Sequence, residues 1–368
     1  MIGIRKSGHR PDYVLLALII ILTLFGLAML ASASSELGKA RFNDSYYYLK
    51  HQVYFGLSLG IAGFLIGYFF QYQYWKKFTL FFLIVNLIAL VLVFSPFGIE
   101  ARNANRWLRI GPLSFQPAES MKLIFIAYLA AWLSNTKIKR TTNFFEGLVP
   151  FALISGLIAI LLILQPATST VAILLGAGLV VYVIDGAKLR YIALIVLVGI
   201  LGIAAIIQAT PYRMERIWGF INKTEDISGK NYQVNQALIA IGSGGLTGKG
   251  FGESASKVNF LPASIDDSIF AIIGEELGFI GAGTVIILFG MLILRMFYLA
   301  NRLRDRFGRL MLIGFGSIIA FQSLVNMASI SGWLPLTGVP LPFVSYGGTA
   351  LATFLTMSGI AVNISKYA

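Results

Sequence analysis

The sequence contains no cysteine, only two histidines and few charged residues, which make up 12% of its 368 positions. Without cysteine, the chain has no disulfide, no thiolate metal site and no cysteine nucleophile. His9 and His51 stand at the edges of apolar blocks, so a Ser-His-Asp triad or a histidine-rich metal centre would need residues that are nearly absent. Any chemistry must therefore use carboxylates, amides, hydroxyls and cationic side chains.

Hydrophobic residues are abundant instead, at 57% of the chain, and the mean hydropathy is +0.79. They form blocks of roughly twenty residues with almost no charge inside, the length that crosses about 30 Å of hydrocarbon as a helix. This pattern excludes a water-soluble globule and predicts an all-α, polytopic membrane protein. The first block exceeds the roughly 7–15 apolar residues of a cleaved signal peptide, so we expect an uncleaved first span. The predicted transmembrane helices, about ten in number, are 13–34, 52–71, 78–96, 118–135, 147–165, 168–185, 191–208, 277–299, 309–327 and 347–365.

The formal net charge of +13 comes from short basic clusters between the apolar blocks. These clusters form no continuous basic face, so nucleic acid is not an expected partner. With a cytoplasmic N-terminus every inner connector is basic, whereas the outer turns near 166 and 328–346 contain no Lys or Arg. The positive-inside rule then predicts that both termini are cytoplasmic. We expect one integral-membrane domain over 1–368, with a large extracytoplasmic loop, 209–265, between the seventh and eighth spans.

Segment 97–122 contains more arginine than a short outer loop should. Arg106 and Arg109 could bind phosphate oxygens of an anion through bidentate hydrogen bonds. Alternatively, they could attract lipid headgroups and anchor the loop at the interface. Glu119 and Lys122 follow at i,i+3 spacing at the head of the fourth span, close enough to pair. Such a pair near the membrane is either functional or a device that fixes helix geometry.

Segment 266–299 is far longer than one span requires, so its first third must lie outside the membrane or along the interface. Asp266 and Asp267 therefore sit near the outer surface, where a desolvated carboxylate could take a proton from a hydroxyl. The alternative is that one of them caps the following helix. Glu275 and Glu276 lie between two glycines and are interpreted as part of a helix junction rather than a second catalytic pair.

The glycine-rich segment 241–252 lacks the residues of a phosphate-binding P-loop and predicts a tightly turning loop, with Lys249 as a surface cation. Arg213 and Arg216 follow the seventh span at i,i+3 spacing and could join the same electropositive outer site. The outer connector 331–348 is uncharged and contains three prolines. Because lipid cannot form hydrogen bonds with its backbone amides, we expect this connector to be buried in protein or to lie at the interface.

These motifs, in this order and spacing, resemble the SEDS family (shape, elongation, division and sporulation) over essentially the whole chain. Within the family, the sequence resembles the FtsW-like branch of cell division more than the RodA-like branch of elongation. The segments that carry the resemblance are NRWLRIGPLSFQPAE (105–119) with Lys122, QALIAIGSGG (236–245), FLP (260–262) with Asp267, GEELG (274–278) and PLPFVSYGG (340–348).

The resemblance implies a peptidoglycan glycosyltransferase of the bacterial cytoplasmic membrane that polymerises lipid II at the outer face during cell division. It implies inversion at the anomeric carbon and an undecaprenyl pyrophosphate leaving group. Expected partners are lipid II, the nascent glycan strand, a class B penicillin-binding protein, divisome proteins and membrane lipids. The family's essential aspartate maps onto Asp267, and its Glu and Lys map onto Glu119 and Lys122. Asp266 stands where relatives commonly have Gly or Thr.

Pyrophosphate leaves without being protonated, so one carboxylate base should suffice and cations should neutralise the leaving group. Asp267 is the predicted base. No cofactor is expected with certainty, and the metal is unknown: a divalent cation, Mg or Mn, could share in the neutralisation, although no metal-ligand spacing supports one. The predicted substrate-binding residues are Arg106, Arg109, Glu119, Lys122, Arg213, Arg216, Lys249 and Asp266.

Two alternatives stay open at this point. A lipid II flippase or transporter would also bind a pyrophosphate lipid, but it should place polar groups near the midplane, and the charges here gather at the outer ends of the spans. The other alternative is an elongation-type, RodA-like polymerase.

Overall fold

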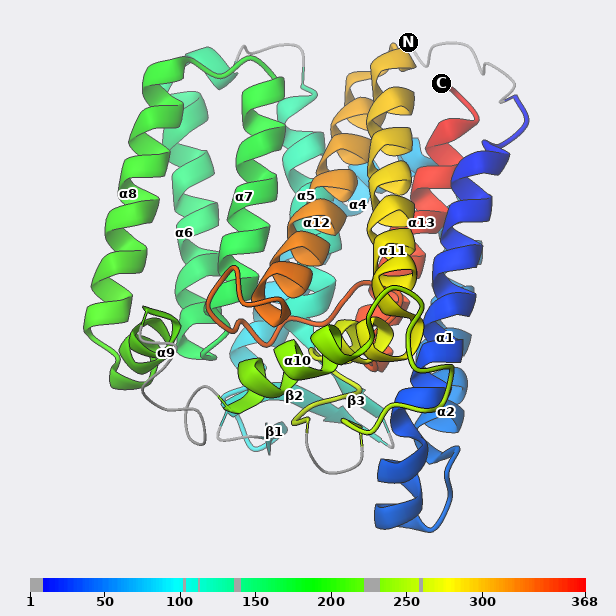
Figure 1. Ribbon diagram of the computed structural model, residues 1–368. Helices are drawn as coiled ribbons and strands as arrows, with labels where there is room; N and C mark the ends of the chain where they lie inside the picture. The colour runs from blue at the N-terminus through cyan, green and yellow to red at the C-terminus, as the bar shows by residue number, and fades with distance from the viewer. Residues whose placement is uncertain (1–8, 102–103, 112, 136–139, 222–231, 258–260) are drawn as a thin grey trace.

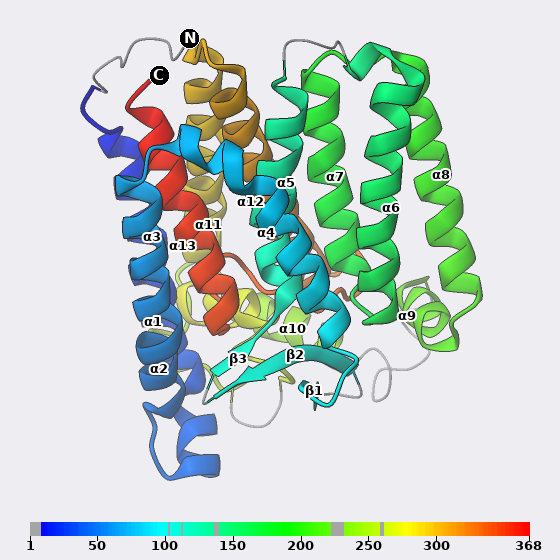
Figure 2. The same ribbon diagram turned by 180° about the vertical axis from the view of Figure 1, so that it is seen from behind.

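The computed structural model describes residues 9–101, 104–111, 113–135, 140–221, 232–257 and 261–368. Long helices run side by side through most of the molecule (Figures 1 and 2). The predicted all-α membrane fold is confirmed. The helices are α1 (Tyr13–Phe42), α2 (Tyr47–His51), α3 (Ser58–Phe69), α4 (Tyr72–Leu92), α5 (Pro117–Leu133), α6 (Val149–Leu164), α7 (Thr168–Ile184), α8 (Leu189–Gln208), α9 (Pro211–Ile221), α10 (Tyr232–Ser243), α11 (Ile269–Arg302), α12 (Arg306–Ile330) and α13 (Gly348–Ser365).

Each predicted span coincides with a helix. A π-helical turn at 52–57 joins α2 to α3, and another at 144–148 leads into α6. In the part of the chain that the structure describes, eight helices are long and apolar enough to cross a membrane, and α7 is a shorter apolar helix. The number of ten spans therefore stays a prediction.

A small antiparallel sheet was not expected from the sequence. It consists of β1 (Gly98–Ala101), β2 (Ala104–Ile110) and β3 (Leu113–Phe115), in the order β1-β2-β3. Leu108 of β2 is paired with Gly98 on one side and Phe115 on the other, and its side chain is buried. The sheet thus joins the end of α4 to the start of α5, where Pro117 occupies the first helical turn.

The two ends of the bundle differ in what they contain. The N- and C-termini lie at one end, and the sheet, α9 and α10 lie at the other (Figure 1). At the terminal end, the guanidinium of Arg306 donates two hydrogen bonds to the Asp185 carboxylate, at 2.6 and 2.7 Å. The basic residues before position 9 and at 137–139, which the orientation prediction uses, lie outside the described residues.

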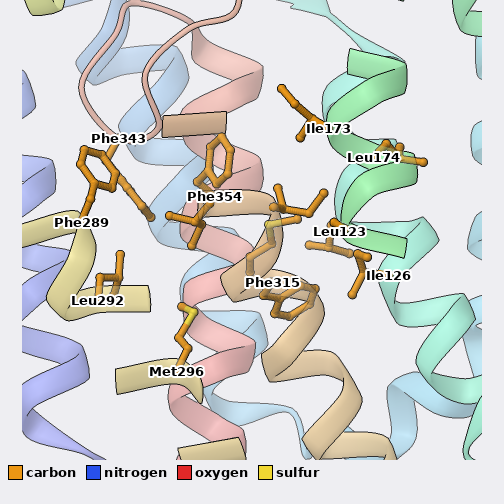
Figure 3. Close-up of a cluster of buried hydrophobic side chains, with 14 of the residues drawn as sticks. Leu123, Ile126, Ile173, Leu174, Phe289, Leu292, Met296, Phe315, Phe343 and Phe354 are labelled. Carbon is orange, nitrogen blue, oxygen red and sulfur yellow. The ribbon is translucent and has the colours of Figure 1, made fainter. Parts of the chain in front are cut away.

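The core lies between α5, α7, α11, α12 and α13, and α8 stands at the edge of the bundle with most of its apolar side chains exposed (Figure 1). Helices α3 and α13 approach closely because Gly359 has no side chain: a Cβ there would lie 2.2 Å from the Phe64 carbonyl oxygen. Figure 3 shows the central apolar cluster, which includes Leu123, Ile126, Ile173, Leu174, Phe289, Leu292, Met296, Phe315, Phe343 and Phe354.

Candidate functional site

Asp267 lies in the turn before α11, at the end of the molecule opposite the termini. The helix begins at Ile269 with Ser268 in the N-cap position, so the alternative that Asp266 or Asp267 caps it is wrong. The side chain of Asp267 is buried, and its Oδ1 accepts a hydrogen bond from Gln233 Nε2 of α10 at 3.2 Å. Asp267 therefore faces protein rather than lipid.

The second half of the connector between α12 and α13, 339–345, is mostly buried against protein, as its composition predicted, whereas Trp333 and Leu334 are exposed. Four of the connector's backbone carbonyls accept hydrogen bonds from side chains of α7, α9 and α12, which replace the water that this apolar segment lacks. The four bonds run from Gln322 Nε2 to Pro340 O (2.9 Å), from Asn326 Nδ2 to Val339 O (2.7 Å), from Ser169 Oγ to Thr337 O (3.1 Å) and from Arg216 to Leu336 O (2.9 Å).

The same connector lies directly beside Asp267. Asn326 Nδ2 donates a second hydrogen bond, to the backbone oxygen of Asp267, at 2.8 Å. Gly338 has a left-handed φ of 66°, and a Cβ at this position would lie 3.7 Å from Asp267 Oδ2. The connector therefore contacts the predicted base, Asp267.

Glu119 and Lys122 form the ion pair that their spacing predicted, with 2.7 Å between Lys122 Nζ and Glu119 Oε1. Both side chains are almost completely buried. Lys122 Nζ also donates to Gln322 Oε1 at 2.7 Å, and Gln322 in turn donates to the connector. The pair is therefore joined to Asp267 through α12. We call Glu119, Lys122, Asp267, Gln322 and Asn326 the connector cluster.

Three of the predicted arginines bond to the connector or to the neighbouring end of α6 and the turn after it. Arg106 donates to the carbonyls of Gln165 and Pro166 in the α6–α7 turn, at 2.9 and 2.6 Å, and Arg213 donates to Ile163 O, near the end of α6, at 3.3 Å. Ser169, at the start of α7, links this turn to the connector, and Arg216 reaches the connector itself. The guanidinium groups of distant segments therefore converge on one region.

Arg109 and Lys249 stand apart from it. Arg109 is exposed on the sheet and lines a surface hollow of about 530 Å³ with Phe97, Ile99 and neighbouring residues, none of them a predicted site residue. Lys249 is ion-paired with Glu275, at 2.7 Å between Nζ and Oε1. A role in substrate binding for either residue stays a prediction.

Asp266 is half-buried and lies near Tyr346 of the connector. Burial, together with the negative charge of Asp266, raises the pKa of the Tyr346 phenol above its usual range. The phenol oxygen is 2.8 Å from His51 Nδ1, and the backbone N–H of Tyr346 donates to Ile265 O at 2.9 Å. Asp266 thus sits at the edge of the site, one residue from the predicted base.

Helix α11 is interrupted at Gly278, where φ is 65° and ψ is −163°. The glycine-rich loop 244–252 bonds to the backbone on both sides of this break, so the predicted helix junction is confirmed. The initial helical segment is buried in protein, and its predicted place outside the membrane or along the interface stays a prediction. The backbone bonds run from Lys249 N to Glu275 O, Gly250 N to Glu276 O, Phe279 N to Gly245 O and Ile280 N to Leu246 O, at 2.9–3.1 Å.

The two glutamates before this break are fully buried and fully paired. Lys257 Nζ lies 3.2 Å from Glu276 Oε1, and Ser32 of α1 donates to both oxygens of Glu276 at 2.6 and 2.7 Å. Glu275 is held by Lys249 and by Ser254 Oγ at 2.5 Å. We call Ser32, Lys249, Ser254, Lys257, Glu275 and Glu276 the break cluster.

Neutral amides are the site residues that sequence reasoning missed. Gln233, Gln322 and Asn326 hold Asp267 or the connector, yet amides attract less attention than charges in an apolar sequence. A signal existed: Gln322, Asn326 and Ser329 recur at i, i+4 and i+7 within an apolar helix, which predicts a polar stripe on one face.

Among the described residues, no three His, Asp or Glu side chains are grouped so that they could hold a metal ion. The divalent cation considered from the chemistry therefore stays an untested expectation.

The comparison with protein families agrees with this architecture. The family model for FtsW, RodA and SpoVE proteins, described as "Cell cycle protein", matches residues 12–368. The chain belongs to the FtsW/RodA/SpoVE family. Stage V sporulation protein E of Bacillus subtilis (strain 168) is 35% identical over 358 residues, covering 97% of each chain. The probable peptidoglycan glycosyltransferase FtsW of Geobacter sp. (strain M18) is 34% identical over 362 residues, covering 98% of each.

Solved structures of the FtsW/RodA/SpoVE family have the same fold. A chain of a peptidoglycan synthase complex matches with a TM-score of 0.78 and 27% identity, over 96% of this chain and 97% of that one. The rod shape determining protein RodA of Thermus thermophilus matches with a TM-score of 0.71 and 27% identity, over 96% of each chain. The predicted SEDS membership is thus confirmed from sequence and from structure.

Proposed function

We propose that this chain is a peptidoglycan glycosyltransferase that polymerises lipid II, with Asp267 as the general base. The observation that carries the proposal is the burial of Asp267 beside the connector, to which Arg216 and, through Gln322, the Glu119–Lys122 pair are also bonded. The names of the FtsW relatives support the same reaction.

The proposed step transfers a glycosyl group with inversion. A hydroxyl oxygen of the acceptor sugar attacks the anomeric carbon of the donor, and its proton passes to the Asp267 carboxylate. The bond from the anomeric carbon to the pyrophosphate oxygen breaks, and undecaprenyl pyrophosphate leaves with the electron pair. General-base assistance contributes about 10²–10⁴ in rate, and charge stabilisation of the leaving group about as much.

The cationic side chains around the connector are the proposed contacts of the pyrophosphate. Arg106, Arg213 and Arg216 now donate to backbone carbonyls. A phosphate oxygen is a stronger acceptor for guanidinium than a neutral carbonyl. Substrate could therefore recruit these groups without a large movement of their helices. Lys122 is more enclosed, and we assign its charge to the electrostatics of the site.

The proposed orientation places both termini in the cytoplasm and Asp267 outside it, in the bacterial cytoplasmic membrane. Basic connectors at the terminal end support this orientation. The undecaprenyl tail would stay in the bilayer while the headgroup reaches the connector. A class B penicillin-binding protein and divisome proteins are the proposed partners, supported by the structural match to a peptidoglycan synthase complex.

The decisive experiment is polymerisation of purified lipid II by this protein with its partner transpeptidase. We expect Asp267→Asn to lower the rate by about 10²–10⁴ and Asp266→Asn to leave most of it. Normal polymerisation by Asp267→Asn would remove Asp267 as the base, and loss in Asp266→Asn alone would move the assignment by one residue.

The flippase alternative is tested in the same preparation. Protein-dependent translocation of lipid II across vesicles, unaffected by Asp267→Asn and without any polymer, would replace the glycosyltransferase proposal. The division role, rather than elongation, is tested by depleting the protein in cells: filamentation with a normal cell width is the expected result, and rounding would assign an elongation role.

A further inference from the structure

We propose that the polar stripe of α12, formed by Gln322, Asn326 and Ser329, is a positioning device that holds Asp267 in register with the Glu119–Lys122 pair. This inference rests on the proposed function. The three residues recur at i, i+4 and i+7, and all are buried. Because a polar side chain inside an apolar helix is costly unless it is bonded, the partners of this stripe show what it holds.

The stripe binds the connector as a ladder with three rungs. Gln322 Nε2 donates to Pro340 O, Asn326 Nδ2 donates to Val339 O, and Ser329 Oγ lies 3.3 Å from Thr337 Oγ1. The residue number rises along α12 as it falls along the connector, so the two segments run antiparallel. Three contacts fix the register of the connector along α12, whereas a single contact would not fix it.

Each amide of the ladder also bonds to a charged residue of the site. Asn326 Nδ2 shares its two hydrogens between Val339 O and the backbone oxygen of Asp267, at 2.7 and 2.8 Å. Gln322 uses its Oε1 to accept from Lys122 Nζ at 2.7 Å. Val339 and Pro340 are adjacent in the connector. Asn326 links Val339 to Asp267, and Gln322 links Pro340 to the Glu119–Lys122 pair.

Amides suit this task because one group donates and accepts without adding charge. A carboxylate at position 326 would have no hydrogen to offer either carbonyl, and an aliphatic side chain would leave both carbonyls buried without a donor. The stripe touches no reacting atom in the proposed mechanism, so it acts through Asp267. Misplacing a base by about 1 Å can cost 10²-fold in rate, and binding energy need not change.

The test is steady-state polymerisation of lipid II by the full-length protein with its partner transpeptidase. Asn326→Ala should lower kcat about 10- to 100-fold and change KM by less than about threefold. Asn326→Ser keeps one donor and should fall between Asn326→Ala and the wild type, which provides a folded variant if the alanine form is unstable. In an Asp267→Asn background, Asn326→Ala should cause no further loss, because there is no base left to position.

Asn363 provides a matched control at the other end of the molecule. Its buried amide also bridges two backbone groups: Nδ2 donates to Tyr68 O at 2.6 Å, and Oδ1 accepts from Tyr72 N at 3.0 Å. Asn363→Ala should lower the melting temperature about as much as Asn326→Ala but keep kcat per folded molecule. Equal kcat in the two alanine variants, or a further tenfold loss in the Asp267→Asn background, would overturn the positioning role.

A readout that needs no activity separates this inference from the proposed function. Hydrogen exchange of residues 264–268 and 336–341 should rise in Asn326→Ala and stay unchanged in Asn363→Ala. If the wild type makes no polymer, the glycosyltransferase proposal fails. In that case the hydrogen-exchange difference alone tests whether Asn326 holds the connector and Asp267 in place. Unchanged exchange in Asn326→Ala refutes this role.

Discussion

Two buried polar clusters lie at the same end of the molecule, but they satisfy their charges in different ways. In the break cluster, Glu275 and Glu276 each have a lysine and a serine hydroxyl as partners. In the connector cluster, backbone carbonyls are partners as well: Gln322 and Asn326 donate to carbonyls of the connector, and Glu119 Oε2 and Asn326 Oδ1 meet no donor among the described residues.

We interpret the break cluster as structural and the connector cluster as part of the proposed active site. A helix that breaks inside a membrane protein exposes backbone groups, and the break cluster, with the glycine-rich loop, replaces their lost partners. The connector cluster instead holds the connector beside Asp267, the proposed base. We therefore expect substitutions in the break cluster to change stability and substitutions around the connector to change rate.

The largest effect on stability should come from Lys257→Ala. It leaves the carboxylate of Glu276 buried without its cation, and breaking such a pair costs about 3–5 kcal/mol. Thermal unfolding in detergent measures the loss. Lys249→Ala is the matched control: its side chain is 37% exposed, so water can replace it at Glu275 and the loss should be smaller. Equal losses would mean that burial does not distinguish the two pairs.

A slightly smaller loss is expected from Gly248→Ala. Gly248 has a φ of 83°, and a Cβ there would lie 2.1 Å from the Glu276 carbonyl oxygen at the break. Strain of this kind costs about 3 kcal/mol. Gly245→Ala, with a φ of 56° and nothing within 4 Å, should cost only about 1 kcal/mol. If unfolding shows the same loss for both variants, the close approach of the loop to α11 is not what requires glycine.

Around the connector, Arg216→Ala should lower kcat/KM about 10- to 100-fold, because it removes a proposed contact of the leaving group. Its unfolding temperature should change little, because the side chain is half-buried and water can replace the bond to Leu336 O. Polymerisation assays should give Arg109→Ala a rate within about threefold of the wild type, because Arg109 lies away from the cluster. Equal rate losses in Arg216→Ala and Arg109→Ala would contradict the predicted placement of the pyrophosphate.

The smallest effect should come from Asp185→Asn, at the terminal end. Burial raises the pKa of Asp185 above 3.8, although the Arg306 guanidinium opposes this shift. A raised pKa in the folded state means that the contribution of Asp185 to stability falls as the pH rises from below 3.8 through the folded value. At neutral pH we expect Asp185→Asn to change stability by less than about 1 kcal/mol. Unfolding across this pH range measures the contribution of Asp185 as the stability of the wild type minus that of the variant, and this difference should fall as the pH rises.

Local pattern was enough to predict several features. Hydropathy located every long helix, the i,i+3 spacing of Glu119 and Lys122 predicted their ion pair, and Gly274 to Gly278 predicted the helix junction. The uncharged connector was expected to be buried because its amides have no partner in lipid. Each of these inferences depends on residues only a few positions apart.

The partners of these features were decided by the tertiary structure. The sequence placed Lys249 in the electropositive site, yet the break in α11 brings it to Glu275. It did not predict that Arg106 and Arg213 bond to neighbouring carbonyls at the end of α6, or that Asn326 bridges Asp267 and Val339. Helix and membrane patterns depend on neighbours along the chain. Which buried donor reaches which carbonyl depends instead on how helices far apart in sequence pack, and single-chain periodicity does not contain that information.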